Sequence, residues 1–498
     1  MYSVKFKLGG AVPVARWSVS IAAMMIAGLP AMASADTLRD ALSQAYASNP
    51  TLTGARAGLR AVDENVAIAR AQGLPDVSAT ASYNKFVKRS ANSFTSPKEA
   101  LGGSATVTVP LYEGGFVRNS VRAAKARVQQ GRASLQATEG DVFTNAVAAY
   151  MDVIRDTAIV DLNAGNVKVL ETDLQASRDR FQVGDLTRTD VAQSQARLAG
   201  ARSSLQSAQA QLDASRQAYL EVVGKFPDNL EPPPPLPGLP AMSEEAVDVA
   251  VANNPDLAAA RQASRAADYD VGIAQSLRMP RLSAFGTGDY TDYRGTLAGG
   301  AAGVKQIDKT ATLGVQAQIP IFQGGEPGAR VRQAQARKSQ AIEAQTAAER
   351  AVIADARTAF SRYQASLGVI DSSLAAVSAN ELALEGVRAE QGVGTRNVLD
   401  VLNAEQELLN ARSTLVSAKR DAYVAGFALL AAMGRAQAKD LGLDGGSLYD
   451  PVANYTRVHN RIWDWDSDPK PKSVATSTLG QPSFSAVPPH SPVASPEK

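Results

Sequence analysis

The chain has no cysteine among its 498 residues. Disulfide bonds, thiolate metal sites, cysteine nucleophiles and an acylated amino-terminal cysteine are therefore excluded. The only histidines, His459 and His490, lie near the carboxyl end, so the body of the chain lacks the usual side chain for proton transfer near neutral pH. We expect a protein that is not an enzyme and that uses no cofactor and no metal ion.

A strong excess of charge is also missing, because 51 Lys and Arg residues balance 49 Asp and Glu residues. A nucleic-acid-binding protein usually has a basic surface, so no nucleic-acid partner is expected.

Long apolar runs are absent after the amino terminus. Residues 1–35 contain Lys5, Lys7 and Arg16, then an apolar run that ends in the small residues Ala33-Ser34-Ala35, which is typical of a secretory signal peptide. An anchoring helix is the alternative, but Pro30 and the small residues favour cleavage. Farther along, the longest apolar run is about Ala425–Met433, well short of the ~20 residues of a spanning helix. We expect an exported chain without a transmembrane helix.

The rest of the chain is a duplication. Asn49-Pro50-Thr51-Leu52 recurs as Asn254-Pro255-Asp256-Leu257, and VPLYEGG from Val109 recurs as IPIFQGG from Ile319. Two copies indicate duplication and not a solenoid, which requires at least three repeats. We predict a first repeat at 36–226, a linker at 227–243, a second repeat at 244–434 and a carboxyl-terminal extension at 435–498. The linker is rich in proline, which favours a stiff extended spacer, and the extension is predicted to be disordered towards its end.

Each repeat begins with a helical segment, which is followed by a pair of strands with one apolar face. Val77, Ala79, Ala81 and Tyr83 alternate with polar residues, which is the period of a strand. Their lengths suit a tilted membrane strand of about 9–11 residues. A soluble sheet that covers a core is the alternative, but nothing else in the chain could cover that face.

The period becomes helical after the paired glycines. Gly115 to Val183 contains no proline, and as one helix it would be roughly 100 Å long. A turn at Val183-Gly184 then leads into a shorter return helix. One helix is expected before the strands, from Thr37 to Gln72, and together with the return helix it roughly matches the long helix in length. We therefore expect these two shorter helices to stack end to end beside the long one. The length of the long helix cannot be covered within one globular domain, so we predict a rod or the wall of a tube.

The proline and glycine motifs mark where strands end and helices begin. Proline cannot donate to a sheet ladder and glycine permits sharp turns. We therefore predict a hinge between barrel and tube at Pro110, Gly114, Gly115, Pro320, Gly324 and Gly325. Four strands per chain leave open edges, which lipid does not tolerate. Two chains would give eight strands, and three would give twelve with room for a lumen.

The two hinge motifs, the Asn-Pro-x-Leu starts and the turn GVGTRNVLDVL from Gly392 together resemble the TolC family of outer-membrane export channels. The resemblance implies an α+β membrane protein, a homotrimer with a twelve-stranded β-barrel continued by a long α-helical periplasmic tunnel. It also implies the outer membrane of a Gram-negative bacterium and partners in a periplasmic adaptor and an inner-membrane transporter. The segment Leu448–Asp468 resembles the type I protein-secretion branch, with an ABC-type transporter. Multidrug efflux is the alternative.

The same resemblance places a gate at the periplasmic end of the tunnel. Asp400 matches an acidic position that faces the lumen, and Arg396 and Asp190 match positions that tie neighbouring coils together. Asn403 stands where a second acid is often found, which implies one acidic ring in place of two. The expected adaptor-docking tips are Val183, Gly184, Val393, Gly394 and Thr395.

Simple helix capping is a second interpretation of the two aspartates. Thr187 and Asn397 each stand three positions before an aspartate, which is a capping pattern. Capping and gating are compatible, and both stay open at this point. A periplasmic adaptor is a rival class, but it would have one hairpin and no paired strands. Trp463 and Trp465 are expected to pack on the helices.

Overall fold

The computed structural model describes residues 36–88, 96–443 and 448–480. The predicted signal peptide at 1–35 and the end of the predicted disordered tail, 481–498, lie outside the described residues. The described residues belong to one compact unit.

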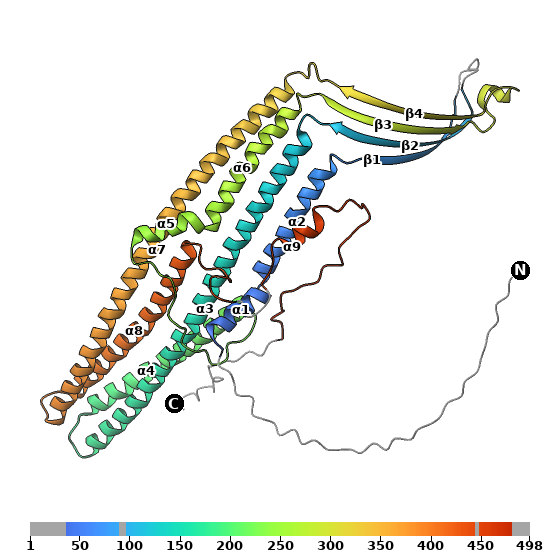
Figure 1. Cartoon of the computed structure of the whole chain (residues 1–498). Helices are drawn as coiled ribbons and strands as arrows, with labels where there is room; N and C mark the ends of the chain where they lie inside the picture. The colour runs from blue at the N-terminus through green and yellow to red at the C-terminus, as the bar shows by residue number, and fades with distance from the viewer. Residues whose placement is uncertain (1–35, 89–95, 444–447, 481–498) are drawn as a thin grey trace, which may run out of the picture. The chain divides into compact units, whose positions relative to one another are not determined.

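The elements of this unit repeat in the same order, as the duplication predicts (Figure 1). The first set is α1 (Leu38–Ser48), α2 (Pro50–Ala71), β1 (Asp76–Lys85), β2 (Glu99–Tyr112), α3 (Phe116–Gln182) and α4 (Arg188–Val223). The second set is α5 (Ser243–Asn253), α6 (Pro255–Ser276), β3 (Arg281–Asp292), β4 (Ile307–Gln318), α7 (Glu326–Gly392) and α8 (Val398–Ala432). A short 3-10 turn, η1 (Leu297–Gly300), joins β3 to β4, and α9 (Ala453–Val458) follows the second set.

The long helices α3 and α7 are the elements against which the other helices pack. Each has 67 residues and would be roughly 100 Å long. The return helix α4 packs along α3, and α8 packs along α7, so each repeat ends in a helical hairpin. The two hairpins meet where α3 contacts α8 and α4 contacts α8.

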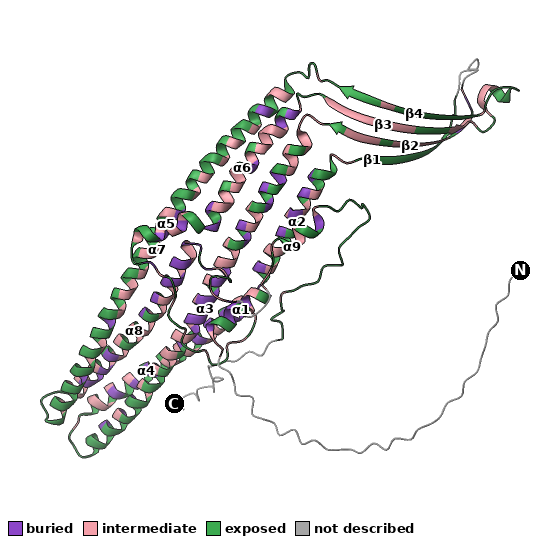
Figure 2. Cartoon of the chain, viewed as in Figure 1, coloured by how far each residue is buried: buried purple, intermediate pink, exposed green. Residues whose placement is uncertain are grey.

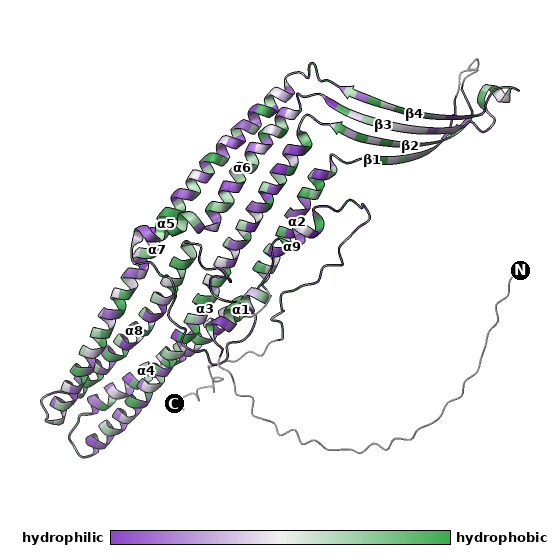
Figure 3. Ribbon diagram, in the orientation of Figure 1, coloured by the Kyte–Doolittle hydropathy of each residue, from purple (hydrophilic) through white to green (hydrophobic). Residues whose placement is uncertain are grey.

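The four strands form one antiparallel sheet in the order β1-β2-β3-β4. Its register separates the side chains into two faces. One row across all four strands is Val77, Val107, Gly286 and Leu313, and the next row is Ser78, Thr106, Thr287 and Thr312. The sheet therefore has one apolar and one polar face, which Figure 3 shows as alternating colours along the strands.

A break in the helix before each strand pair differs from the prediction of one continuous helix. Proline follows Asn49 and Asn254, and each asparagine has an extended backbone, with ψ of 126° and 125°. The residue before a proline is disfavoured in the helical region, so α1 and α2, like α5 and α6, are separate helices.

The two asparagines also join helices end to end. The Oδ1 of Asn49 accepts from the N–H groups of Thr51 and Leu52, while its Nδ2 donates to Val222 O at 2.9 Å. In the second repeat Asn254 caps α6 in the same way and donates to Ala432 O at 3.1 Å. In each repeat one asparagine side chain thus accepts from free N–H groups at the start of a helix, α2 or α6, and donates to a free carbonyl at the end of another, α4 or α8. The prediction that the short helices stack end to end beside the long one is confirmed.

The main core lies where α1 crosses the middle of α3 and the end of α4 (Figure 2). Phe143, Tyr150 and Tyr219 are fully buried there. The hydroxyl of Tyr150 lies 3.0 Å from Asp36 O and 2.6 Å from Glu231 O. This core therefore fixes the start of the unit and the proline-rich linker on α3.

One helix meets the length and composition of a membrane span, contrary to the expectation from apolar runs. It is α7, and little of its most apolar 18-residue stretch is buried. Length and composition alone are weak grounds for a span. Because α8 runs alongside α7, α7 forms part of the helical wall.

Candidate functional site

The junction between strands and helices is built on paired glycines in both repeats. Gly114 and Gly115 have φ of 63° and 86°, and Gly324 and Gly325 have φ of 59° and 82°. Other residues rarely adopt this left-handed region. A Cβ on Gly114 would also lie 2.4 Å from the Cβ of Met279. Both turns lead directly into α3 and α7.

The two prolines of the predicted hinge do not occupy equivalent places. Pro110 lies inside β2 next to a β-bulge between Pro110 and Tyr112, whereas β4 ends at Gln318, before Pro320. The prediction that both prolines end a strand is therefore wrong for Pro110. The bulge leaves Leu111 unpaired, and β1 begins opposite Thr108, so Pro110 has no partner on the β1 side, where a residue without an N–H is tolerated.

The opposite end of each hairpin is a tight turn with an exposed valine. Gly184 and Gly394 have φ of 85° and 83°, and Thr395 N donates to Glu390 O at 3.0 Å. Val183 and Val393 are 75% and 77% exposed. The two turns thus present the same small apolar tip.

The capping interpretation of the two aspartates is confirmed. Asp190 accepts from the N–H of Thr187 at 2.9 Å, and Asp400 accepts from the N–H of Asn397 at 3.3 Å, while the reciprocal bonds complete two capping boxes. Both side chains use Oδ2, so the Oδ1 of each carboxylate is not part of the cap.

Arg396 differs from the expected arrangement. Its Nε lies 2.8 Å from Glu390 Oε2, and both side chains are half exposed. The pair joins the two sides of one turn. In the chain as described, Arg396 does not reach the other hairpin.

Asn403 has a role that its sequence position did not indicate. Its Oδ1 accepts from Arg197 Nη2 at 2.6 Å, which joins α8 to α4 of the other hairpin. Sequence reasoning considered Asn403 only as a missing acid and overlooked Arg197. Nothing in the local sequence signals this contact.

A second link between the hairpins consists of three charged side chains. Glu405 on α8 is buried and forms an ion pair with Arg388 on α7 at 2.6 Å. Its carboxyl also contacts the carboxyl of Asp173 on α3. Burial raises the pKa of both carboxyls above their ordinary values, and Arg388 opposes the rise. Asp173 Oδ2 and Glu405 Oε2 lack a donor among the described residues, so a shared proton would satisfy the pair.

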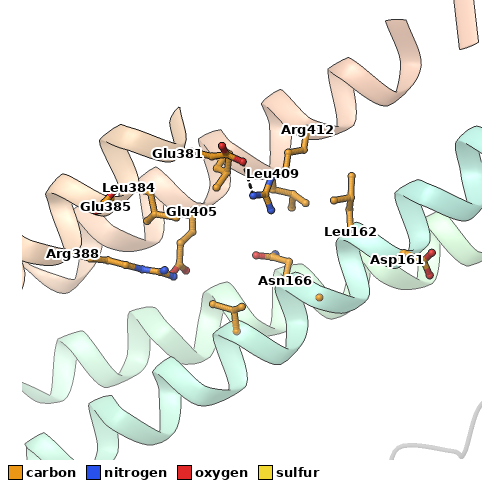
Figure 4. A pocket seen from close by; sticks show the side chains of 13 residues that line it. Asp161, Leu162, Asn166, Glu381, Leu384, Glu385, Arg388, Glu405, Leu409 and Arg412 are labelled. Carbon is orange, nitrogen blue, oxygen red and sulfur yellow. Dashed lines mark hydrogen bonds and ion pairs between the residues drawn. The ribbon is translucent and has the colours of Figure 1, made fainter. Parts of the chain in front are cut away.

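Glu405 and Arg388 border a groove of about 580 Å³ between the hairpins. Figure 4 shows Leu162 and Asn166 on α3 facing side chains of α7 and α8. Arg412 pairs with Glu381 across α8 and α7 at 2.8 Å, and its counterpart Arg202 pairs with Glu171 at 2.7 Å. The duplicated sequence could have predicted that repeated pair. Among residues 36–88, 96–443 and 448–480, no cluster of acids and histidines could hold a metal ion.

Comparison with known proteins agrees with this architecture. The family model for outer membrane efflux proteins matches residues 41–225 and 246–435. The outer membrane efflux protein BepC of Brucella suis is 35% identical over 430 residues, covering 86% of this chain and 92% of BepC. The outer membrane protein TolC of Escherichia coli is 27% identical over 479 residues, covering 91% of this chain and 95% of TolC.

Two further proteins extend the comparison. The alkaline protease secretion protein AprF of Pseudomonas aeruginosa is 27% identical over 329 residues, covering 64% of this chain and 66% of AprF. The solved structure of VceC from Vibrio cholerae has a TM-score of 0.68 at 23% identity, covering 80% of this chain and 96% of VceC. The chain therefore belongs to the outer membrane efflux protein family, the TolC-like channels of the Gram-negative outer membrane.

Proposed function

We propose that three copies of this chain form the outer-membrane exit of a type I secretion system. In this proposal a periplasmic adaptor and an inner-membrane ABC transporter deliver the cargo to the helical tips. One observation supports it most: each strand pair continues through two left-handed glycines into a 67-residue helix. A barrel that continues into a helical wall provides one path from the periplasm to the outside.

The protein-secretion role is supported by AprF, a relative named for alkaline protease secretion, and by the resemblance of Leu448–Asp468 to that branch. An efflux pump is the second candidate, because BepC, 35% identical, is named an efflux protein. The two roles differ in cargo and not in the architecture of the channel.

We further propose that Asp400 lines the narrow entrance of the tunnel, with Asp190, Arg396 and Asn403 around it. Three copies of an acid in a narrow ring would attract cations. The capping box supports this, because it fixes Asp400 in the first turn of α8 through one oxygen only. Val183, Gly184, Val393, Gly394 and Thr395 would receive the adaptor, since both turns expose an apolar tip.

A strain that lacks the chain tests the assignment. We expect proteins secreted in one step to disappear from the medium, while resistance to bile salts and dyes stays unchanged. Loss of resistance alone would establish the efflux candidate, and loss of both would indicate a channel shared by the two routes. If neither changes, the proposed function is wrong.

Complementation then tests the tips. The double variant Val183→Asp/Val393→Asp should reach the outer membrane at wild-type levels yet fail to restore export, because it places charges on both docking turns. Full restoration would exclude these valines from docking.

A further inference from the structure

The segment that follows α9 exposes three large apolar side chains. Ile462, Trp463 and Trp465 are 73%, 72% and 86% exposed. The expectation that the tryptophans pack on the helices is therefore wrong within this chain. A single exposed apolar residue is ordinary, but three within four positions require an explanation.

The segment is firmly held at its base. Tyr455 of α9 packs on the cluster formed by α2 and α3, and Asn454 Nδ2 donates to Asp63 Oδ2 on α2 at 2.9 Å. Arg70 on α2 hydrogen-bonds Asn460. The tryptophans therefore project from a segment whose base is fixed on α2 and α3.

Two arginines neutralise acids of the same segment. Arg457 forms a two-fold contact with Asp468, with N to O distances of 2.6 and 2.8 Å. Arg461 lies 2.8 Å from Asp466. These ion pairs close the segment into a loop and neutralise Asp466 and Asp468, whereas Asp464, between the two tryptophans, forms no ion pair with any described residue.

The position of the loop indicates what it meets. Ile462 and Trp463 border an open hollow of about 650 Å³ together with Ile68 and Leu74, at the end of α2, and Val77 of β1. Val77 belongs to the apolar face of the sheet, in the row with Val107 and Leu313. The polar face has its own hollow at the same level, which is lined by Thr108, Ser283 and Gln316 among others. The tryptophan loop therefore lies on the apolar side of the sheet, where β1 begins.

We propose that the loop at 461–468 is an interfacial anchor, in which Trp463 and Trp465 bind the phospholipid headgroup region of the inner leaflet of the outer membrane. The apolar face of an outer-membrane sheet contacts lipid, and the loop continues that face towards the periplasm. Tryptophan has an apolar ring and a polar N–H, and it concentrates at membrane interfaces for that reason. This inference rests on the outer-membrane location and is independent of the cargo.

Intrinsic fluorescence can test the proposal without any substitution. The chain has three tryptophans, and Trp17 lies in the predicted signal peptide. A protein that begins at Asp36 therefore reports only Trp463 and Trp465. Its trimer is reconstituted in phosphatidylcholine vesicles, with or without a phosphatidylcholine brominated near the glycerol end of its acyl chains.

We expect the brominated lipid to remove more than half of the emission. Replacing part of the lipid by phosphatidylglycerol should leave most of the quenching in place, because two of the three aspartates of the loop, Asp466 and Asp468, are paired with arginines. Acrylamide in water identifies the alternatives. Emission that bromine leaves intact and acrylamide quenches would mean that the loop faces water. Emission shielded from both quenchers would mean that a second copy of the chain covers the loop. Either result overturns the proposal.

Single-tryptophan variants locate each ring. Trp463→Phe and Trp465→Phe should both retain quenching by brominated lipid, and the double variant gives the background emission. If only one variant is quenched, the tryptophan that this variant retains is the anchor, and the proposal is wrong for the other ring. Absence of quenching in both variants would contradict the anchor.

Discussion

At the scale of single residues, departures from the duplication mark contacts between the two hairpins. Glu405 and Asp173 have no acidic counterparts at the equivalent positions of the other repeat, which are Gln195 and Ala383. They meet each other and Arg388 between α3, α7 and α8. A feature that joins the repeats cannot be symmetric between them, so the exceptions to the repeat are informative.

This carboxyl pair should make stability depend on pH. Its raised pKa means that the folded chain holds a proton more tightly than the unfolded chain. Stability is then fully present below the ordinary carboxyl pKa and is lost as the pH rises through the raised value. Glu405→Gln keeps a neutral donor at every pH. Relative to the wild type, we expect it to gain stability as the pH rises above the ordinary glutamic acid pKa of 4.5, where the wild-type pair must give up its proton.

Thermal melting of the detergent-solubilised protein across this pH range measures the effect. Glu385→Gln is the matched control, because Glu385 lines the same groove on α7 but is exposed. Its melting temperature should follow the wild type at every pH. Parallel curves for Glu405→Gln and the wild type would show that no proton is shared.

At the scale of elements, the asparagine joints hold the helices in line. Asn254 caps α6 through its oxygen and binds the last turn of α8 through its nitrogen. Gly434 has φ of 72°, and a Cβ there would lie 2.5 Å from Asn253 O. Gly224 ends the first hairpin with the same left-handed backbone, at φ of 81°, which explains why glycine recurs at both joints.

Substitution can separate the two functions of the joint. Asn254→Ala loses the cap and the bridge, and should cost about 1–2 kcal/mol. Asn254→Asp keeps the capping oxygen but replaces the donor with an acceptor that faces Ala432 O, so it should also be destabilised. Asn253→Ala is the control, because exposed Asn253 donates only to Val249 O of its own helix. A wild-type melting temperature for Asn254→Asp would show that the bridge contributes nothing.

Much of this arrangement follows from local sequence. Alternation identified the strands with their apolar face, and helical period with absent proline identified α3 and α7. The break at Asn49 was missed because a helical period continues on both sides of Pro50. The bulge at Pro110 was missed because a register shift depends on the partner strand. The Arg197–Asn403 contact requires knowledge of how two hairpins pack, which no local pattern contains.

At the scale of the whole molecule, each chain is one third of a closed wall. β1 and β4 each have one edge unpaired within the described chain, and an open edge is not tolerated in lipid. The family fold resolves this as a trimer with a twelve-stranded barrel. The burial pattern agrees, since α3 has neighbours on several sides while α7 is largely exposed (Figure 2). The exposed side of α7 is therefore available to the next copy.

We propose that this wall encloses a conduit whose periplasmic entrance is lined by Asp400. Single-channel recording in planar bilayers, with divalent cations added on the tip side, tests whether Asp400 faces the conduit. Asp400→Ala removes the charge and the cap, whereas Asp400→Asn keeps a capping oxygen and removes only the charge. Asp190→Asn is the control for the equivalent cap in the other hairpin.

We predict that both Asp400 variants form channels in which the concentration of divalent cation needed for block rises about tenfold or more. Asp190→Asn should change it less. Block that is unchanged in Asp400→Asn would contradict the account, because an acid that lines the entrance cannot lose its charge without effect on cation binding there.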